Sequence, residues 1–122
     1  MNPGLKFKQP EGLKKNHQFR QVYTRGRRLN GPHLTIFFMP NQLQLNRLGL
    51  SVSKKRFKLS TRRHYIQRRL REAWRLNQRG FLPGYDIVIS AQRFTPGPIR
   101  FAEIENELLS LAKKARLFQG ET

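Results

Sequence analysis

The sequence predicts an α/β (α+β) two-layer sandwich, in which helices pack on one small central sheet. Three stretches carry apolar residues at helical spacing, and three shorter stretches are rich in β-branched and aromatic residues. Their order along the chain is helix, strand, strand, helix, strand, helix, which is typical of helices layered on a sheet. Because 122 residues suffice for one core but not for two, residues 1–122 are expected to form a single domain.

The first element is a short helix that follows a polar arm. Residues 1–12 contain two prolines and two glycines and are expected to be flexible. Asn16 is a suitable N-cap, apolar residues recur at helical spacing from Phe19 to Tyr23, and Gly26 is placed to end the helix.

Two candidate strands come next. Residues 33–39 are rich in β-branched and aromatic side chains and are bounded by prolines, and residues 47–53 form a second run. We expect the two strands to form an antiparallel pair. Because side chains alternate along a strand, only one of Phe37 and Phe38 is expected to face the core.

The stretch 54–79 is the most informative part of the chain, with eleven basic residues and one acid, Glu72. Ser60 or Thr61 is suited to cap a helix here, which Gly80 helps to end. Helical periodicity gives this helix two faces. The apolar face comprises Ile66, Leu70, Ala73 and Asn77, with Trp74 beside them, and the polar face comprises His64, Gln67, Arg68, Arg71, Arg75 and Arg79.

A third strand and a last helix complete the predicted fold. Residues 85–91 form a nearly continuous apolar run, which indicates a buried strand. Residues 100–117 carry an apolar stripe, with glutamates early and basic residues late, as the helix dipole favours. Asp86 in the strand and the glutamates of the helix therefore have structural explanations.

The net charge points to a polyanionic partner. Twenty-five Lys and Arg against seven Asp and Glu give a formal charge of +18 and a pI near 11.7. A generally solvated basic surface is the alternative, but a nucleic acid is the expected partner at this charge density. The sequence contains no long apolar run, lipidation motif or secretory signal, so we expect a cytoplasmic protein with no membrane partner.

The sequence offers no convincing catalytic or metal site. It has no cysteine, its carboxylates form no obvious acid–base pair, and its glycines match no nucleotide-binding loop. His17, His33 and Lys54 are the best candidates for a self-sufficient ribonuclease acting through the 2′-hydroxyl, but nothing in their spacing favours that chemistry. We expect no catalytic residue and no metal ligand in this chain.

Three aromatic residues are interleaved with the basic ones, namely Phe19, Tyr23 and Phe37. Such rings can stack on unpaired bases of RNA. Aromatic residues at helical spacing are more often part of a core, so both explanations stay open.

Several segments resemble the bacterial ribonuclease P protein family. Residues 13–23 (Leu-Lys-Lys-Asn-His-Gln-Phe-Arg-Gln-Val-Tyr), followed by Gly26, are similar to the opening helix of the family. Residues 48–55 (Leu-Gly-Leu-Ser-Val-Ser-Lys-Lys) resemble its strand ending in a lysine pair. Residues 68–75 (Arg-Arg-Leu-Arg-Glu-Ala-Trp-Arg) resemble the end of its arginine-rich helix, and all segments occur in the order of the family.

The chain departs from the family pattern where the arginine-rich helix begins. Residues 63–65 (Arg-His-Tyr) stand where the family usually has Arg-Asn-Arg, and Gln67 occupies a usually basic position. Residues 57–59 (Phe-Lys-Leu) replace the customary Gly-Asn-Ala, with about one extra residue. Arg56 and Arg62 supply positive charge nearby and are expected to compensate.

The resemblance implies a fold and an activity. The fold is a sandwich similar to the second domain of ribosomal protein S-five, with a left-handed βαβ crossover, whereas general rules favour a right-handed one. The activity is that of an accessory subunit in the ribonucleoprotein endonuclease that removes the 5′ leader from precursor tRNA. The catalytic centre and most Mg²⁺ ligands are then expected in the RNA subunit, bound by one monomeric protein.

The resemblance also implies two binding surfaces. The residues expected to contact the catalytic RNA are Lys54, Lys55, Arg56, Lys58, Arg62, Arg63, His64, Arg68, Arg71 and Arg75. The residues expected to bind the leader, in a cleft between the first helix and the sheet, are Phe19, Tyr23, Phe37, Gln67 and Arg71. The alternative is a structural ribosomal protein or RNA chaperone with no role in cleavage, which the same charge would suit.

Overall fold

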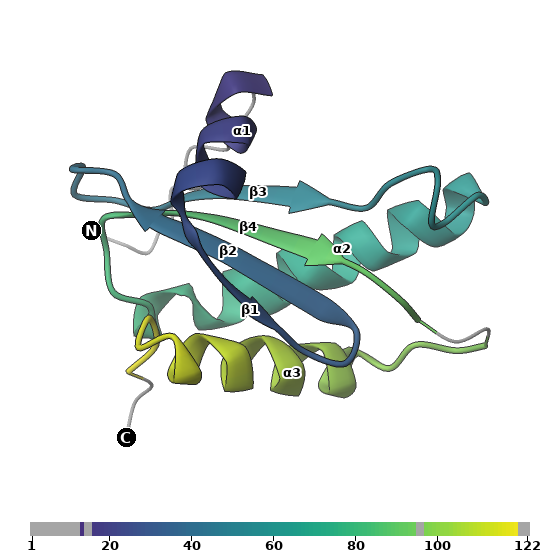
Figure 1. Cartoon of the computed structure of the whole chain (residues 1–122). Coiled ribbons are helices and arrows are strands. Elements are labelled where there is room, and N and C mark those ends of the chain that lie inside the picture. Colours follow the sequence, from purple (N-terminus) through teal and green to yellow (C-terminus); the bar gives the residue numbers. More distant parts are fainter. Residues whose placement is uncertain (1–12, 14–15, 95–96, 120–122) are drawn as a thin grey trace.

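The computed structural model describes Leu13 and the ranges 16–94 and 97–119 (Figure 1). The predicted arm, residues 1–12, lies outside the described residues. The helices are α1 (Asn16–Arg25), α2 (Ser60–Asn77) and α3 (Phe101–Lys114), and a 3-10 turn, η1 (Gln78–Gly80), follows α2. The strands are β1 (Arg27–Asn30), β2 (Leu34–Pro40), β3 (Arg47–Ser51) and β4 (Tyr85–Ala91).

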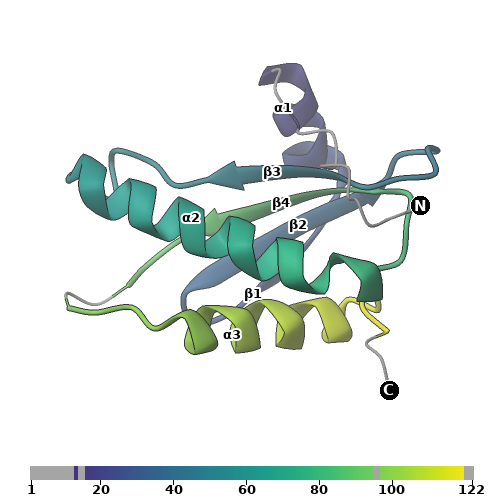
Figure 2. The same ribbon diagram turned by 180° about the vertical axis from the view of Figure 1, so that it is seen from behind.

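The strands form one mixed sheet in the order β1-β2-β4-β3. Strand β2 pairs antiparallel with β1 and with β4, whereas β3 pairs parallel with β4. Helix α2 joins the two parallel strands across one face of the sheet (Figure 2). Seen from the helix side with these strands pointing up, β4 lies to the left of β3, so the crossover is left-handed, as the family resemblance implies.

Two expectations about the strands were wrong. Strand β1 was not predicted, because four mostly exposed residues at a sheet edge carry too short a pattern to recognise. The expected antiparallel pair of residues 33–39 and 47–53 does not form, because β4 lies between β2 and β3. Parallel pairing through a helical crossover is a non-local feature that neither strand encodes alone. The strand predicted at residues 85–91 is confirmed.

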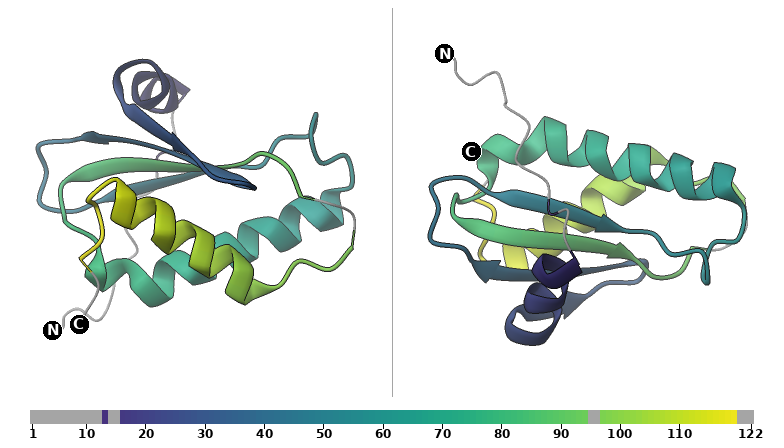
Figure 3. Two further views of the ribbon diagram at one scale, coloured as in Figure 1. Left: turned by 60° about the horizontal axis from the view of Figure 1, so that its bottom comes forward. Right: turned by 90° about the horizontal axis from the view of Figure 1, so that it is seen from above.

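The helices lie on both faces of the sheet. Helices α2 and α3 cover one face, and the main core lies between them and the sheet (Figures 1 and 3). Helix α1 lies on the other face and covers only part of it, and we call this second face the open face. None of the described helices is both long and apolar enough to span a bilayer.

The predicted apolar face of α2 is confirmed, but its predicted cap is wrong. Its buried residues are Ile66, Leu70, Ala73 and Trp74. The N-cap is Leu59, in an extended conformation and without a side-chain hydrogen bond, rather than Ser60 or Thr61. The first turn is instead held by the carbonyl of Leu59, which accepts from the backbone of Arg62 and Arg63 at 3.2 and 3.1 Å.

Helix α1 packs on the open face through a second, smaller apolar cluster. Val22 is buried against Leu13 and Val88, with Phe19, Phe37 and Met39 around them. Gly49 makes the approach possible, because a Cβ there would lie 2.8 Å from the Phe19 ring. Phe38 lies in the main core while Phe37 belongs to this cluster, so the predicted division between the two is confirmed.

Candidate nucleic-acid interface

The exposed side of α2 is a row of cations. The predicted polar face is confirmed, because His64, Arg68, Arg71 and Arg75 of α2 and Arg79 of the following η1 turn are exposed, and Gln67 is half-buried. The buried stripe of α2 turns toward the sheet and α3, so these side chains point away from the core. Such a row can follow the phosphates of an RNA strand.

The β3–α2 loop, residues 52–59, extends this positive surface. Lys54, Lys55, Arg56 and Lys58 are all exposed in it. Phe57 is its anchor, with only 5% of its surface exposed, a backbone hydrogen bond to Ser53 O of 3.0 Å and a ring centroid 6.1 Å from that of Phe94. The aromatic residue that replaces a customary glycine therefore fixes the loop while its charged neighbours face solvent. We call this loop and the exposed face of α2 the cationic surface.

Three arginines of the cationic surface also hold the backbone in place. Arg63 Nη1 donates to Phe57 O at 2.9 Å and to Lys58 O at 3.2 Å, which closes the loop onto the first turn of α2. Arg56 Nη1 donates to Gln92 O at 3.2 Å, and Arg62 Nη1 donates to Gly97 O at 3.0 Å. These bonds tie the loop and α2 to the segment between β4 and α3, so the cations are presented on a rigid frame.

Tyr65 differs in role from the arginine that is customary at its position. Its hydroxyl donates to Ile99 O at 2.7 Å, and its ring packs against the main core. The guanidinium of Arg69 lies over this ring, 4.8 Å from the centroid. Tyr65 therefore joins α2 to the start of α3 and is not part of the exposed cationic row.

Within the exposed row, Arg75 forms an ion pair with Glu72 of the same helix. Its Nη2 and Nε donate to the Glu72 carboxylate at 2.7 and 3.2 Å in a two-pronged contact. This hydrogen bond lowers the pKa of Glu72 from its ordinary value of 4.5 and raises the pKa of Arg75. At neutral pH the pair is fully charged, so part of the attraction of Arg75 for phosphate is offset.

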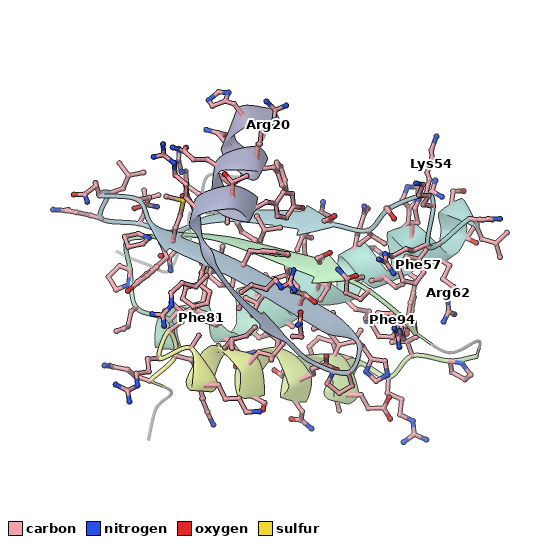
Figure 4. All side chains as sticks on the ribbon, viewed as in Figure 1. Arg20, Lys54, Phe57, Arg62, Phe81 and Phe94 are labelled. Atoms are coloured by element: carbon pink, nitrogen blue, oxygen red, sulfur yellow. The ribbon has the colours of Figure 1, made fainter. Side chains whose placement is uncertain are left out.

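A groove separates the β3–α2 loop from the segment after β4. The aromatic rings of Phe57 and Phe94 line this groove, together with four basic side chains. These cations are Arg56, Lys58, Arg62 and Arg93. Figure 4 shows Phe57, Phe94 and Arg62 together at this end of the molecule, with Lys54 projecting from the loop above them.

On the open face, the three predicted aromatic residues do come together. The Tyr23 ring meets Phe37 edge-on, with centroids 4.7 Å apart and planes at 80°, and it lies 6.3 Å from Phe19. Tyr23 is 40% exposed, whereas Phe19 and Phe37 are half-buried in the cluster under α1. The core explanation therefore holds for Phe19 and Phe37, whereas Tyr23 keeps an exposed ring and its stacking on a base stays a prediction. We call these three residues the aromatic surface.

Gln67 and Arg71, expected beside the aromatic residues, lie elsewhere. They belong to α2, and α1 and α2 lie on opposite faces of the sheet (Figure 3). The structure therefore does not bring them against the aromatic surface. A leader that reached both would have to pass around the β3 edge of the sheet.

Four polar residues outside the predicted site were missed in the sequence. Arg28 lies opposite Phe37 in the β1–β2 register, and Asn30 lies opposite Thr35, so both side chains belong to the open face. Gln92 and Arg93 follow β4 directly. The alternation of β4 continued past its end would have placed Gln92 on this face, but β1 was too short to give such a signal.

The residues that suit acid–base chemistry are not assembled into a site. His33 is bound to Glu107 of α3, with its Nδ1 2.8 Å from Oε1, whereas His17 lies on α1 across the sheet. Among the described residues no three His, Asp or Glu side chains gather as metal ligands would.

Fold and surfaces together define a small, strongly basic α/β protein with one cationic and one aromatic surface. Known proteins narrow this class further. The family model Ribonuclease P matches residues 7–116. The ribonuclease P protein component of Natranaerobius thermophilus is 37% identical over 107 residues, covering 88% of this chain and 91% of that protein. The same component of Lachnoclostridium phytofermentans is 42% identical over 110 residues, covering 90% and 93%.

Solved structures agree with the sequence relatives. The ribonuclease P protein from Thermotoga maritima superposes with a TM-score of 0.76 at 28% identity, covering 85% of this chain and 96% of that one. The protein from Staphylococcus aureus gives 0.76 at 29% identity, covering 87% and 95%. The chain belongs to the ribonuclease P protein family, the protein components of an endoribonuclease of tRNA processing.

Proposed function

We propose that this chain binds the catalytic RNA of ribonuclease P through its cationic surface and the 5′ leader of precursor tRNA through its aromatic surface. The observation that carries the proposal is that these two surfaces differ in chemistry and lie on different faces of one rigid sheet. In this division of labour the protein supplies substrate affinity and charge screening. The RNA subunit supplies the catalytic centre.

The cationic surface suits a folded RNA. The exposed side of α2 carries mainly arginines, with Leu76 as its one exposed large apolar side chain, so it suits phosphates rather than base edges. Arg62 and Arg63 are bonded to backbone carbonyls, and they serve in this proposal as much to position the loop as to contact RNA. His64 is exposed between them and Arg68, and it donates to phosphate in place of the customary asparagine.

The aromatic surface suits a single strand. A leader is unpaired, so its bases can be splayed out and stacked on a ring such as that of Tyr23. A paired stem would present phosphates instead, for which the cationic surface is better placed. Gln67 and Arg71 stay a prediction for the leader, reached only around the β3 edge.

Mg²⁺ is assigned mainly to the RNA in this proposal. The described residues offer no cluster of three carboxylate or histidine ligands, so the chain is a poor match for a dedicated metal site. Its charge of +18 lowers the repulsion between RNA phosphates, which reduces the Mg²⁺ concentration that the RNA requires. We propose one monomeric protein per RNA.

Reconstitution with a bacterial ribonuclease P RNA tests the proposal. Cleavage of precursor tRNA at limiting Mg²⁺ should increase strongly when the protein is added, and the protein alone should cleave nothing. Arg68→Ala should weaken binding to the RNA subunit, whereas Lys114→Ala, an exposed charge on α3, should not.

Two results would contradict the proposed function. If the protein gives no gain at limiting Mg²⁺, a structural ribosomal protein or RNA chaperone becomes the better explanation. If the purified chain cleaves precursor tRNA without any RNA subunit, it is a nuclease in its own right.

A further inference from the structure

Two amide side chains on the open face are held in fixed orientations by buried hydroxyls. Thr35, only 5% exposed, donates from Oγ1 to Asn30 Oδ1 at 3.0 Å. Ser90, 7% exposed, accepts from Gln92 Nε2 at 2.6 Å through its Oγ. Neither hydroxyl is accessible to a partner, so each one acts through the amide that it orients.

Asn30 and the two orienting hydroxyls belong to one row across the sheet, and Gln92, two residues beyond Ser90, reaches back to this row through its hydrogen bond to Ser90; we call this the amide row. Thr35 pairs with Asn30 on one side and with Ser90 on the other, and Ser90 pairs with Ser51. The aromatic surface lies one row away, because Phe37 and Val88 are the next residues of β2 and β4 on the same face. Two residues along a strand span about 7 Å. A nucleotide next to one stacked on Tyr23 would therefore lie over the amide row.

The amide row also leads to the cationic surface. Ser51 ends β3, and the β3–α2 loop with Lys54 begins directly after it. Gln92 is joined to the same loop, because its carbonyl accepts from Arg56 Nη1 at 3.2 Å. A single strand that runs from Tyr23 toward the cations of this loop has to cross the row.

We infer that Asn30 and Gln92 read base edges of the bound leader and give the enzyme a preference for leader sequence. A carboxamide offers a donor and an acceptor side by side, which is the pattern that recognises a base edge, whereas lysine and arginine on phosphate carry no sequence information. The orienting hydroxyls of Thr35 and Ser90 prevent the amides from rotating to suit any base. This inference rests on the proposed function, because it requires the leader to lie on the open face.

Competition among precursor tRNAs with randomised leaders measures the preference directly. With the reconstituted holoenzyme, kcat/KM should vary about tenfold with the base at one or two adjacent leader positions. Asn30→Ala and Gln92→Ala should each reduce this spread to about twofold at one position, with the rest of the profile unchanged. Thr35→Val should reduce it at the Asn30 position, although Thr35 is buried and touches no RNA.

Matched controls separate this inference from the proposed function. Gln44→Ala, an exposed amide in the β2–β3 loop, should leave the profile unchanged. Thermal melting of each variant checks that the fold is intact. If leader-bearing substrates still bind better than mature tRNA but Asn30→Ala and Gln92→Ala keep the native profile, the amide assignment is wrong and the leader site stands.

A native profile that is flat at every leader position also overturns the amide assignment. If the leader adds no affinity at all, and Tyr23→Ala changes nothing, the leader site itself is refuted and the inference falls with it.

Discussion

Tyr23 is the aromatic side chain of the open face that is most available to a partner. Phe37 meets its ring edge-on at 4.7 Å, and Phe19 lies against Gly49, so the support beneath Tyr23 is rigid. A fixed ring loses little conformational entropy when a base stacks on it. The contribution of this residue to leader binding should therefore come from its face and not from its hydroxyl.

Tyr23→Ala should weaken binding of a leader-bearing precursor to the holoenzyme by about 1–3 kcal/mol. Tyr23→Phe should retain most of the affinity, because it keeps the stacking surface. Equilibrium binding of precursor and mature tRNA measures both effects. An equal loss for both substrates would contradict a leader contact.

The Glu72–Arg75 ion pair is expected to depend on pH. Because Arg75 lowers the pKa of Glu72, the pair is complete above pH 4.5 and is lost as the pH falls through the lowered pKa. NMR titration should give Glu72 a midpoint below 4.5, and Arg75→Gln should raise it toward that ordinary value. A midpoint unchanged by Arg75→Gln would show that the pair does not persist in solution.

Residues 63–65 at the start of α2, of which His64 and Tyr65 depart from the family pattern, have three different roles. Arg63 turns inward to the loop carbonyls, His64 is exposed, and Tyr65 reaches the backbone before α3. Sequence placed all three on a signature known for RNA contact. It could not separate them, because burial depends on where the loop and α3 lie.

At the scale of elements, Glu107 joins α3 to the turn between β1 and β2. Its Oε2 accepts from the backbone of His33 and Leu34 at 2.8 and 2.7 Å, and Oε1 lies 2.8 Å from His33 Nδ1. Gly31 leaves room for the carboxylate, because a Cβ there would lie 2.6 Å from Oε2. The helix-dipole explanation that sequence suggests for this glutamate is thus incomplete.

Glu107→Ala should lower the free energy of unfolding by about 2 kcal/mol, because it leaves backbone donors of the turn without partners. Glu103→Ala, an exposed acid in the first turn of the same helix, should cost less than about 1 kcal/mol. Urea denaturation compares the two variants. Equal effects would show that the contact with the turn adds nothing beyond the dipole.

Strong local patterns made several elements predictable. The apolar face of α2, the strand at residues 85–91 and the opposite facing of Phe37 and Phe38 each follow from periodicity within one segment. Strand β1 could not be predicted in this way because its four residues are mostly exposed. The insertion of β4 between β2 and β3 could not be predicted either, because it depends on a partner distant in the chain. The left-handed crossover was reached through family resemblance, against the general rule.

In the candidate site too, features set by local periodicity could be predicted, and features set by distant parts of the chain could not. Exposed cations on α2 follow from helical periodicity, and the meeting of Tyr23 with Phe37 is consistent with the cleft that the resemblance implies. The separation of Gln67 from the aromatic surface cannot be predicted from periodicity, because it depends on which face of the sheet each helix packs against. The hydrogen bonds that orient Asn30 and Gln92 could be predicted only if the strand register were already known.

At the scale of the whole molecule, the charge of +18 should dominate affinity for the RNA subunit. The logarithm of the binding constant should fall linearly with the logarithm of the salt concentration. Arg68→Ala should reduce the slope by about 0.7 to 0.9, the value for one lost phosphate contact, and Lys114→Ala should leave it unchanged. Similar slopes for Arg68→Ala and the native chain would place Arg68 outside the interface.

The central claim is that the two surfaces bind different RNAs. A photoreactive phenylalanine derivative at position 23 or at position 68 of the reconstituted holoenzyme tests it most directly, with precursor tRNA bound. The claim predicts that position 23 crosslinks to the 5′ leader and position 68 to the RNA subunit. Crosslinks from position 23 to the RNA subunit alone, or from position 68 to the leader alone, would contradict it.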